Sequence, residues 1–182
     1  MTDQPVLDNM KARRSCRAYS SRMPDRALLA QVCEAGTWAP SGHGRQSPRI
    51  VVVTEPALRA RLSRMNADIF RTVATHPLPP DFDPFYGAPV VLLVLADRSV
   101  PTYLHDGCAV LANMANAAQA VGLGSCWIHR AKEEFESPEG KAILDELGIQ
   151  GDYAGIGHLA VGFPAKEPAA PLPRKADYII WK

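Results

Sequence analysis

Three arginines and one serine lie close together near the start of the chain, in the segment RRSCR at residues 13–17. Arg13, Arg14 and Arg17 carry guanidinium forks that suit bidentate binding of phosphate and of planar acceptors, and Ser15 adds a hydroxyl donor. Adjacent side chains point in different directions in a helix or an extended strand, so one phosphate would rarely contact all three arginines. The segment therefore predicts a ligand with acceptors spread along its length, and the alternative is a solvated basic face.

Two further segments have residue types suited to such a ligand. PSGHGRQ, at 40–46, is rich in turn residues, and its two glycines let a flat ligand approach the main chain closely. The alternative for this segment is a flexible connector. PRK, at 173–175, places two cations before the last extended segment, either as a second phosphate contact or as a solvated surface.

The charges of the whole chain nearly cancel, with 20 Lys and Arg against 19 Asp and Glu and a formal net charge of +1. So weak a field does not attract nucleic acid or an anionic membrane, and any anion site must be local. The longest apolar stretches, such as 88–96 and 156–161, are too short to cross a bilayer, and residues 1–10 lack the order of a signal peptide. We expect a soluble, cytoplasmic protein without nucleic-acid or membrane partners.

The four cysteines form no CxxC pair, and the five histidines have no HxxxH spacing. We therefore expect neither a disulfide framework nor a metal site. Most of the cysteines are better interpreted as buried, reduced thiols that act as small apolar residues.

The hydrophobic pattern alternates helical and extended segments along 182 residues, which suits one domain over 1–182 of α/β or α+β class. The pattern predicts helices at 6–14, from 24 to the stop at 38–40, at 56–65, 103–121 and 137–147, and strands at 49–54, 90–96, 124–128 and 155–164, with a last extended stretch at 178–181. Residues 76–89 contain five prolines and are expected to form a surface loop or a lid edge.

The segment 103–121 predicts the most informative helix, because it is rich in alanine and nearly uncharged past Asp106. A helix that is apolar on most faces must be buried on most faces. A chain of this size has little other surface with which to cover such a helix, so we expect a partner subunit to pack on part of it. The alternative is a central helix in the core of a monomer.

The ordered set of segments resembles the FMN-dependent nitroreductase family nearly from end to end. RRSCR matches the family's RRSxR motif, WAPSGHGRQSP matches its APSxxNxQP loop, and YGAP, the alanine-rich helix, GLGSCWI, AVGFP and the late arginine follow in family order. The resemblance implies a three-layer α+β fold with a mixed, mostly antiparallel central sheet flanked by helices, assembled as an intertwined homodimer with FMN sites at the interface.

The resemblance also assigns roles to individual residues. It implies that Arg13, Ser15 and neighbouring Arg14 hold the phosphate end of FMN, that Arg17 lies near the N1 and O2 edge of the flavin ring as the catalytic cation, and that Arg174 completes the phosphate grip. Pro40, Ser41 and Gly42 would reach the flavin from the other subunit, and Trp127, Ile128 and His129 would lie over or beside the ring. These would be the cofactor-binding residues of the site.

The activity implied is that of a flavoprotein oxidoreductase. NADH or NADPH would reduce FMN in a ping-pong reaction with hydride transfer through flavin N5, and a nitroaromatic, a quinone or an activated alkene would be the electron acceptor. A fixed cation such as Arg17 would stabilise the negative charge of the reduced ring. The rival class is a non-catalytic flavin- or nucleotide-binding or sensing module.

Departures from the family pattern limit what can be carried over. Gly44 stands where the family loop often has asparagine, and Arg49 where it has tryptophan. His129 is either a proton donor or a satisfied structural histidine. Asn66 either reaches the pyrimidine edge of the ring or caps the end of its helix.

Overall fold

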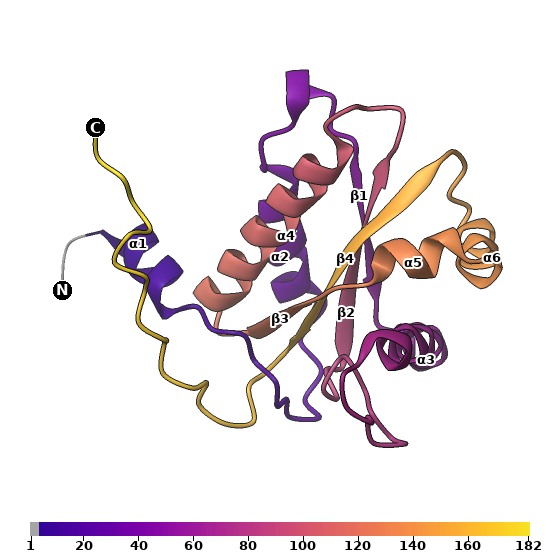
Figure 1. Ribbon diagram of the computed structural model, residues 1–182, viewed down its shortest axis with the longest axis horizontal. Coiled ribbons are helices and arrows are strands. Elements are labelled where there is room, and N and C mark those ends of the chain that lie inside the picture. The colour runs from indigo at the N-terminus through magenta and orange to yellow at the C-terminus, as the bar shows by residue number, and fades with distance from the viewer. Residues whose placement is uncertain (1–3) are drawn as a thin grey trace.

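The computed structural model describes residues 4–182, and these form an α+β arrangement of three layers (Figure 1). The central sheet contains four strands in the order β1-β2-β4-β3. Their bounds are Pro48–Val53 for β1, Val90–Asp97 for β2, Gly124–Ile128 for β3 and Tyr153–Gly162 for β4. All three ladders are antiparallel, and the parallel pairing is an isolated bridge between Ser15 and Ser125. The expected mostly antiparallel sheet between helices is thereby confirmed.

Helices cover both faces of this sheet. The helices are α1 at Pro5–Ala12, α2 at Arg26–Thr37, α3 at Pro56–Val73, α4 at Tyr103–Ala120, α5 at Ala131–Glu136 and α6 at Pro138–Glu146, with a short 3₁₀ turn at Gly42–Gly44. Figure 1 shows α2 and α4 on one side of the sheet and α3, α5 and α6 on the other. The sheet is therefore the layer that connects the helices of both faces.

Strand β2 shows why the sheet lies in the middle layer. Its alternate residues Val90, Leu92 and Val94 pack toward α2 and α4, and Val91 and Leu93 pack toward α3 and α5. Successive side chains of a strand point to opposite faces, so a strand buried on both faces must be apolar at every position. The continuous run at 90–96 predicted this arrangement correctly.

Three elements differ from the sequence prediction. Helix α3 continues to Val73 rather than ending near residue 65, and its start is capped by Glu55, whose carboxylate accepts from the backbone N–H of Leu58 at 2.7 Å. Helix α5 was not predicted, because six residues are too few to show a helical period. The stretch 178–181 forms no strand within the described protomer.

Helix α4 is only partly covered. Val110, Leu111 and Met114 are buried against the sheet and α2, whereas Leu104 is half exposed and Ala112 is exposed. The protomer thus covers one face of the helix and leaves room for a partner on another.

The chain after β4 forms an arm, defined here as residues 164–182, in which every residue is exposed. Figure 1 shows the arm in yellow, running away from the sheet and past α1. It carries the large apolar side chains Leu172, Tyr178, Ile179, Ile180 and Trp181, the last 89% exposed. So much exposed apolar surface indicates that something else covers the arm.

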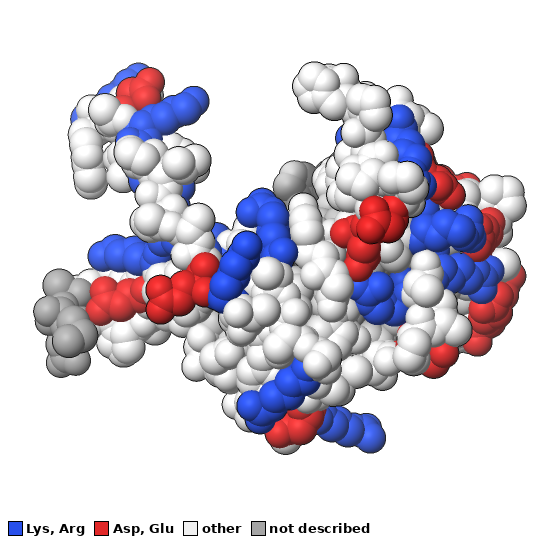
Figure 2. All heavy atoms as spheres, turned by 90° about the horizontal axis from the view of Figure 1, so that it is seen from below, with Lys and Arg blue, Asp and Glu red and all other residues white. Residues whose placement is uncertain are grey.

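Among residues 4–182, no helix combines the length and the hydropathy needed to span a membrane. Charges of both signs share the face shown in Figure 2, and they are interspersed at the end that carries α3 and α6.

Candidate functional site

The RRSCR segment lies against the outer edge of β3. Helix α1 ends at Ala12, and the Cys16 N–H donates to the Ser125 carbonyl at 2.8 Å, while Ser15 and Ser125 form the parallel bridge. Tyr19 anchors the other end of the segment, because its single O–H lies within hydrogen-bonding distance of the carbonyls of Cys16 and Ala160, at 2.9 and 3.1 Å. The cluster of arginines is therefore held on the sheet edge by backbone pairing.

Two of the three arginines, together with Ser15, lie near enough to Cys126 to act on its thiol. Burial raises the pKa of the Cys126 thiol, opposed by the charge of Arg17, a hydrogen bond from Ser15 and the charge of Arg13. Arg17 also lies 5.9 Å from the centre of the Tyr86 ring. Two cations and a hydroxyl thus act on the same thiol beside β3.

Arg14 points elsewhere. Its guanidinium donates to the Arg13 carbonyl at 2.6 Å and also to the Lys11 carbonyl, so its charge caps the C-terminal end of α1. Cations are favoured there by the free carbonyls and the helix dipole. In this structure Arg14 stabilises α1 and does not face the Cys126 region with Arg13 and Arg17.

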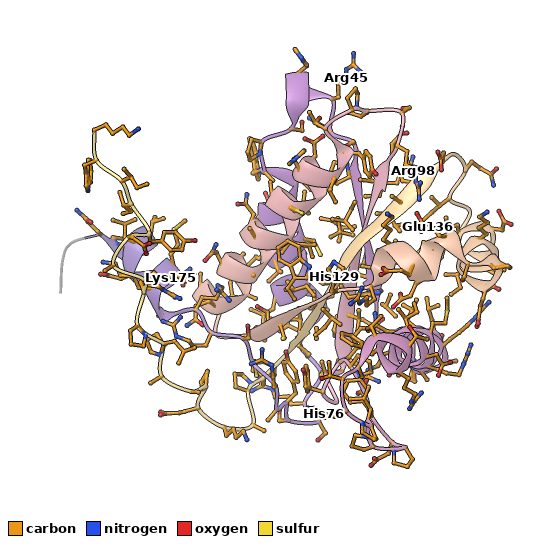
Figure 3. All side chains as sticks on the ribbon, in the orientation of Figure 1. Arg45, His76, Arg98, His129, Glu136 and Lys175 are labelled. Atoms are coloured by element: carbon orange, nitrogen blue, oxygen red, sulfur yellow. The ribbon has the colours of Figure 1, made fainter. Side chains whose placement is uncertain are left out.

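The end of β3 carries the next three predicted residues. Trp127 is 41% exposed and packs beside Gly157, where a Cβ would lie 2.6 Å from its Nε1. Ile128 is buried in the core, so only its backbone can face a ligand. His129 follows near the middle of the molecule, and its imidazole is exposed (Figure 3). Whether His129 is a proton donor or a satisfied structural histidine stays a prediction.

The loop containing Pro40, Ser41 and Gly42 is held by a carboxylate that the sequence analysis did not assign to the site. Asp106, at 4% exposure, accepts from the Gly42 N–H at 3.0 Å, the Ser47 hydroxyl at 2.7 Å and the Thr102 hydroxyl at 3.1 Å. Burial acts to raise the pKa of Asp106, but these hydrogen bonds outweigh it and hold the pKa below its usual value. The sequence signal that could have identified Asp106 as a site residue is its isolated charge in an otherwise uncharged helix.

Pro40 and Ser41 also line a cavity of about 350 Å³ between α2, β1 and the start of α4. The glycine at position 42 is required, because a Cβ there would lie 2.3 Å from the Thr102 Oγ1. The close approach of the loop to α4 therefore depends on the absence of a side chain.

The two halves of the predicted site lie at opposite ends of α4. Near one end, the Asn9 amide of α1 donates to the Asn116 carbonyl at 2.9 Å, and near the other end Gly42 binds Asp106. Ten residues of helix separate Asp106 from Asn116, which corresponds to roughly 15 Å. Figure 3 shows the same separation, with Arg45 at the far end of the loop and Lys175 beside α1. One protomer therefore does not bring Pro40–Gly42 to the arginines.

Arg174 lies on the exposed arm, in a shallow hollow with Lys175, Tyr178 and Trp181. Just before it, residues 167–171 share a hollow with Asp8, Lys11 and Arg14 of the α1 region. The arm thus passes the start of the RRSCR segment before it reaches Arg174.

Asn66 has a different place from either expectation. The capping role is wrong, because α3 continues seven residues beyond it to Val73. Its side chain is 0% exposed, and its Nδ2 donates to the His129 carbonyl at 2.9 Å and to Glu134. Asn66 therefore lies beneath the end of β3 and contacts its backbone.

The donor set beside β3 fits a phosphorylated, planar ligand. Guanidinium forks and a hydroxyl bind phosphate oxygens and ring acceptors, and the exposed Trp127 and the half-buried Tyr86 offer flat surfaces. Among the described residues, no group of three or more His, Cys, Asp and Glu side chains could hold a metal ion. The fold is that of a three-layer α+β protein, and this donor set has the chemistry that a phosphorylated aromatic cofactor requires.

Comparison with known proteins agrees with this class. Residues 10–163 match the Nitroreductase family, and the chain belongs to that family. A relative from Archaeoglobus fulgidus carries the provisional name NADH dehydrogenase/NAD(P)H nitroreductase. It is 26% identical to this chain, over 90% of this chain and 88% of the relative's length.

Two solved structures have the same fold. A nitroreductase with bound FMN from Bacteroides fragilis superposes with a TM-score of 0.86 at 27% identity, over 97% of this chain and 98% of that one. A nitroreductase with bound FMN from Desulfitobacterium hafniense superposes with a TM-score of 0.83 at 25% identity, over the whole of both chains. The expected family and three-layer fold are confirmed.

Proposed function

We propose that this chain is an FMN-dependent NAD(P)H oxidoreductase of nitroreductase type whose acceptor is a nitroaromatic, a quinone or an activated alkene. The observation that carries the proposal is the convergence of Arg13, Ser15 and Arg17 beside β3. FMN-bound relatives of the same fold support the choice of cofactor. The name of the archaeal relative supports a nicotinamide nucleotide as reductant.

Each group in the site has a distinct task. Arg13 and Ser15 bind the phosphate end of the cofactor, with Arg174 from the arm as a further cation. When bound, FMN would supply the ring that accepts hydride from NAD(P)H and passes it to the acceptor in alternating half-reactions. Arg17 would lie beside that ring, where its permanent positive charge would stabilise the negative charge of the reduced state. Trp127 and the backbone of Ile128 and His129 form the surface beside the ring.

The chain works as a homodimer in this proposal, because the loop at 40–42 must come from the partner subunit. The separation of the two half-sites along α4 supports this requirement. The edge strand β1 and an apolar groove lined by Met23, Leu29 and Val52, with a volume of about 580 Å³, offer a docking place for the arm of a second copy. Exchange of arms would cover the exposed apolar residues of 172–181 and complete both sites.

The rival reading is a flavin- or nucleotide-binding module without catalysis. Such a module would share the arginines but would need no open face for a nicotinamide. Trp127 and His129 at the end of β3 are exposed, and this accessible surface favours the enzyme.

The test is spectroscopic. Purified protein, or protein reconstituted with FMN, should be yellow and should bleach when NADH or NADPH is added without oxygen. Adding an acceptor such as a quinone should restore the colour, and initial rates at several acceptor concentrations should give parallel double-reciprocal lines. Yellow protein that no nicotinamide bleaches would establish the binding module instead. Protein that takes up no FMN would overturn both readings.

A further inference from the structure

Three polar side chains with 0% exposure meet beneath the end of β3: Asn66 on α3, Glu134 on α5 and His158 on β4. His158 Nε2 lies 2.6 Å from Glu134 Oε2, and the Asn66 amide donates to Glu134 Oε1 and to the His129 carbonyl. The three elements are thereby joined to the backbone that follows β3. We call these three side chains the buried triad.

Folding alone does not account for this triad. A buried polar group costs free energy unless it is hydrogen-bonded, and an apolar replacement for a buried pair is often at least as stable. The triad is also incompletely satisfied, because Asn66 Oδ1 and His158 Nδ1 have no hydrogen-bond partner among the described residues. Because burying these polar groups is less favourable than burying apolar ones, we infer that the cluster performs a task that apolar side chains could not.

The backbone above the triad has an unusual conformation. Arg130 has φ 82° and ψ 3°, the left-handed region, which is strained for a residue that carries a side chain. Such a conformation persists only where the surroundings hold it. The Arg130 guanidinium pairs with Glu133 at 2.9 Å, and the Glu134 N–H donates to the Arg130 carbonyl at 3.1 Å.

The hydrogen bond from Asn66 orients the peptide between His129 and Arg130. In a trans peptide the carbonyl and the following N–H point in opposite directions. The structure contains no cis peptide bond among the described residues, so a His129 carbonyl turned inward to Asn66 turns the Arg130 N–H outward.

We propose that the buried triad positions the His129–Arg130 peptide so that the Arg130 N–H faces the cofactor, with Glu134 and His158 fixing the Asn66 amide that holds the carbonyl. These are positioning residues, and they act through the backbone without touching the ligand. The inference rests on the proposed FMN function for its consequence, but the orientation of the peptide is a property of the protein alone. A donor held in this way strengthens as negative charge develops on the ring, so it favours the reduced cofactor.

The test compares Glu134→Leu, which removes the carboxylate at similar volume, with Asn66→Ala, which leaves the Glu134–His158 pair intact. The matched control is Glu136→Gln, on the same helix but exposed and paired with Arg98 at 3.0 Å (Figure 3). Glu134→Gln is the conservative variant, because its amide oxygen can still accept from Asn66.

The first readout needs no flavin. Amide hydrogen exchange of the cofactor-free protein at residue 134, whose N–H donates to the Arg130 carbonyl, should be at least about tenfold faster in Glu134→Leu and Asn66→Ala than in the wild type, and unchanged in Glu136→Gln. Equal exchange in all four proteins would overturn the positioning role. A variant without a cooperative unfolding transition would also overturn it, because the triad would then be needed for folding itself.

The second readout uses the FMN-loaded protein. Both variants should bind FMN within about threefold of the wild type, but the flavin midpoint potential should become more negative and anaerobic reduction by NADH or NADPH should slow about tenfold or more. Glu134→Gln should recover most of both. An unchanged flavin midpoint potential in folded Asn66→Ala would contradict the proposal. Absence of FMN binding by the wild type would count against the proposed function, while the exchange experiment would still decide the orientation of the peptide.

Discussion

Asp106 on α4 accepts a hydrogen bond from Ser47 at 2.7 Å, across a sequence separation of 59 residues. The same carboxylate accepts from the Gly42 N–H at 3.0 Å. The first turn of α4 therefore fixes both ends of the loop that we propose reaches the flavin of the partner subunit. This relationship connects the packing of α4 with the composition of the site.

The change Asp106→Asn should weaken FMN binding about tenfold, since a hydrogen bond to a charged group is worth roughly 1.5–3 kcal/mol and the amide retains part of it. Because the pKa of Asp106 is lowered in the folded protein, its contribution is complete above the unfolded pKa and is lost only as pH falls through the lower folded pKa. FMN titration should therefore give the same difference between variant and wild type at pH 5 and at pH 8.

The control for this change is Glu55→Gln, at the cap of α3, whose carboxylate also accepts from two backbone N–H groups. It should leave FMN affinity unchanged. Equal weakening by both changes would show a general loss of stability rather than a loop effect.

The three arginines of RRSCR should separate into three roles. Arg13→Ala should weaken FMN binding about 10- to 100-fold through loss of a charge-assisted phosphate contact. Arg17→Ala should retain much of the FMN but slow its anaerobic reduction, and Arg17→Lys should recover part of the rate because the charge is kept. Arg14→Ala should change FMN affinity least, since its guanidinium caps α1. Stopped-flow reduction and FMN titration measure the two quantities separately, and equal loss of binding for Arg13→Ala and Arg17→Ala would contradict this division.

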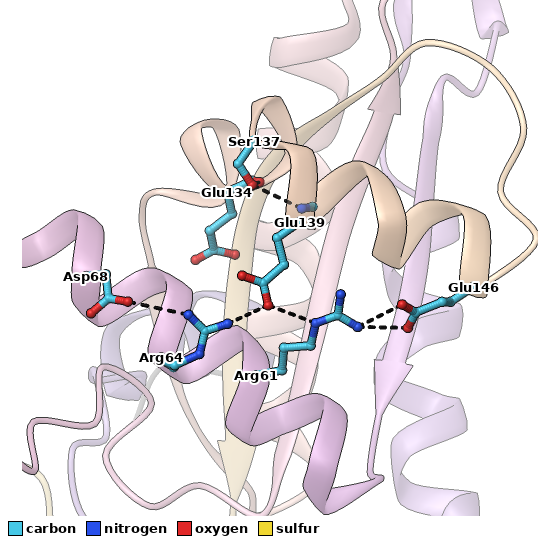
Figure 4. A network of polar contacts seen from close by, with 8 residues as sticks. Arg61, Arg64, Asp68, Glu134, Ser137, Glu139 and Glu146 are labelled. Atoms are coloured by element: carbon cyan, nitrogen blue, oxygen red, sulfur yellow. Dashed lines mark hydrogen bonds and ion pairs between the residues drawn. The ribbon is translucent and has the colours of Figure 1, made fainter.

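Neighbouring residues at the start of α6 should differ strongly in their effect on stability. A Cβ at Gly140 would lie 2.1 Å from the Glu134 backbone carbonyl, so Gly140→Ala should lower the free energy of unfolding by about 1–3 kcal/mol. Glu139 joins Arg61 at 2.9 Å and also Arg64 (Figure 4), but these partners are 29% and 55% exposed, and exposed ion pairs contribute little. Glu139→Ala should therefore have a much smaller effect in urea denaturation. A larger loss for Glu139→Ala would assign the ion pairs a role that their exposure does not predict.

The arm should determine assembly. Replacing Ile179 and Ile180 together by aspartate should weaken the dimer, because apolar groups that dock on a partner would become charged. FMN affinity should fall with it, since Pro40–Gly42 of the partner subunit would no longer reach the site. Sedimentation velocity at several protein concentrations measures the first effect. Replacement of Ala169 and Ala170 by aspartate adds the same charge to the same arm and should leave the dimer intact, whereas an unaltered dimer in the Ile179 and Ile180 variant would exclude arm exchange.

Part of the site could be predicted because its signals are local. The arginines and the serine of RRSCR, the glycines of the 40–46 loop and the continuous apolar strand at 90–96 are all visible within short windows. Asp106 could have been found from its isolation in α4. The buried triad could not, because Asn66 and Glu134 are 68 residues apart and no local pattern requires them to meet.

The amino-acid sequence by itself determined the order of helices and strands, the two-faced burial of β2 and the group of cations near the N-terminus, because these depend on residue type and on periodicities of a few residues. Only the tertiary structure decided that Arg14 turns back to cap α1, that Arg13 and Arg17 share a region beside β3, and that the 40–42 loop lies at the far end of α4. The physical reason is that these outcomes depend on which distant segments pack on the same helix or strand edge, and hydrophobic patterning specifies that a face is buried without specifying its partner.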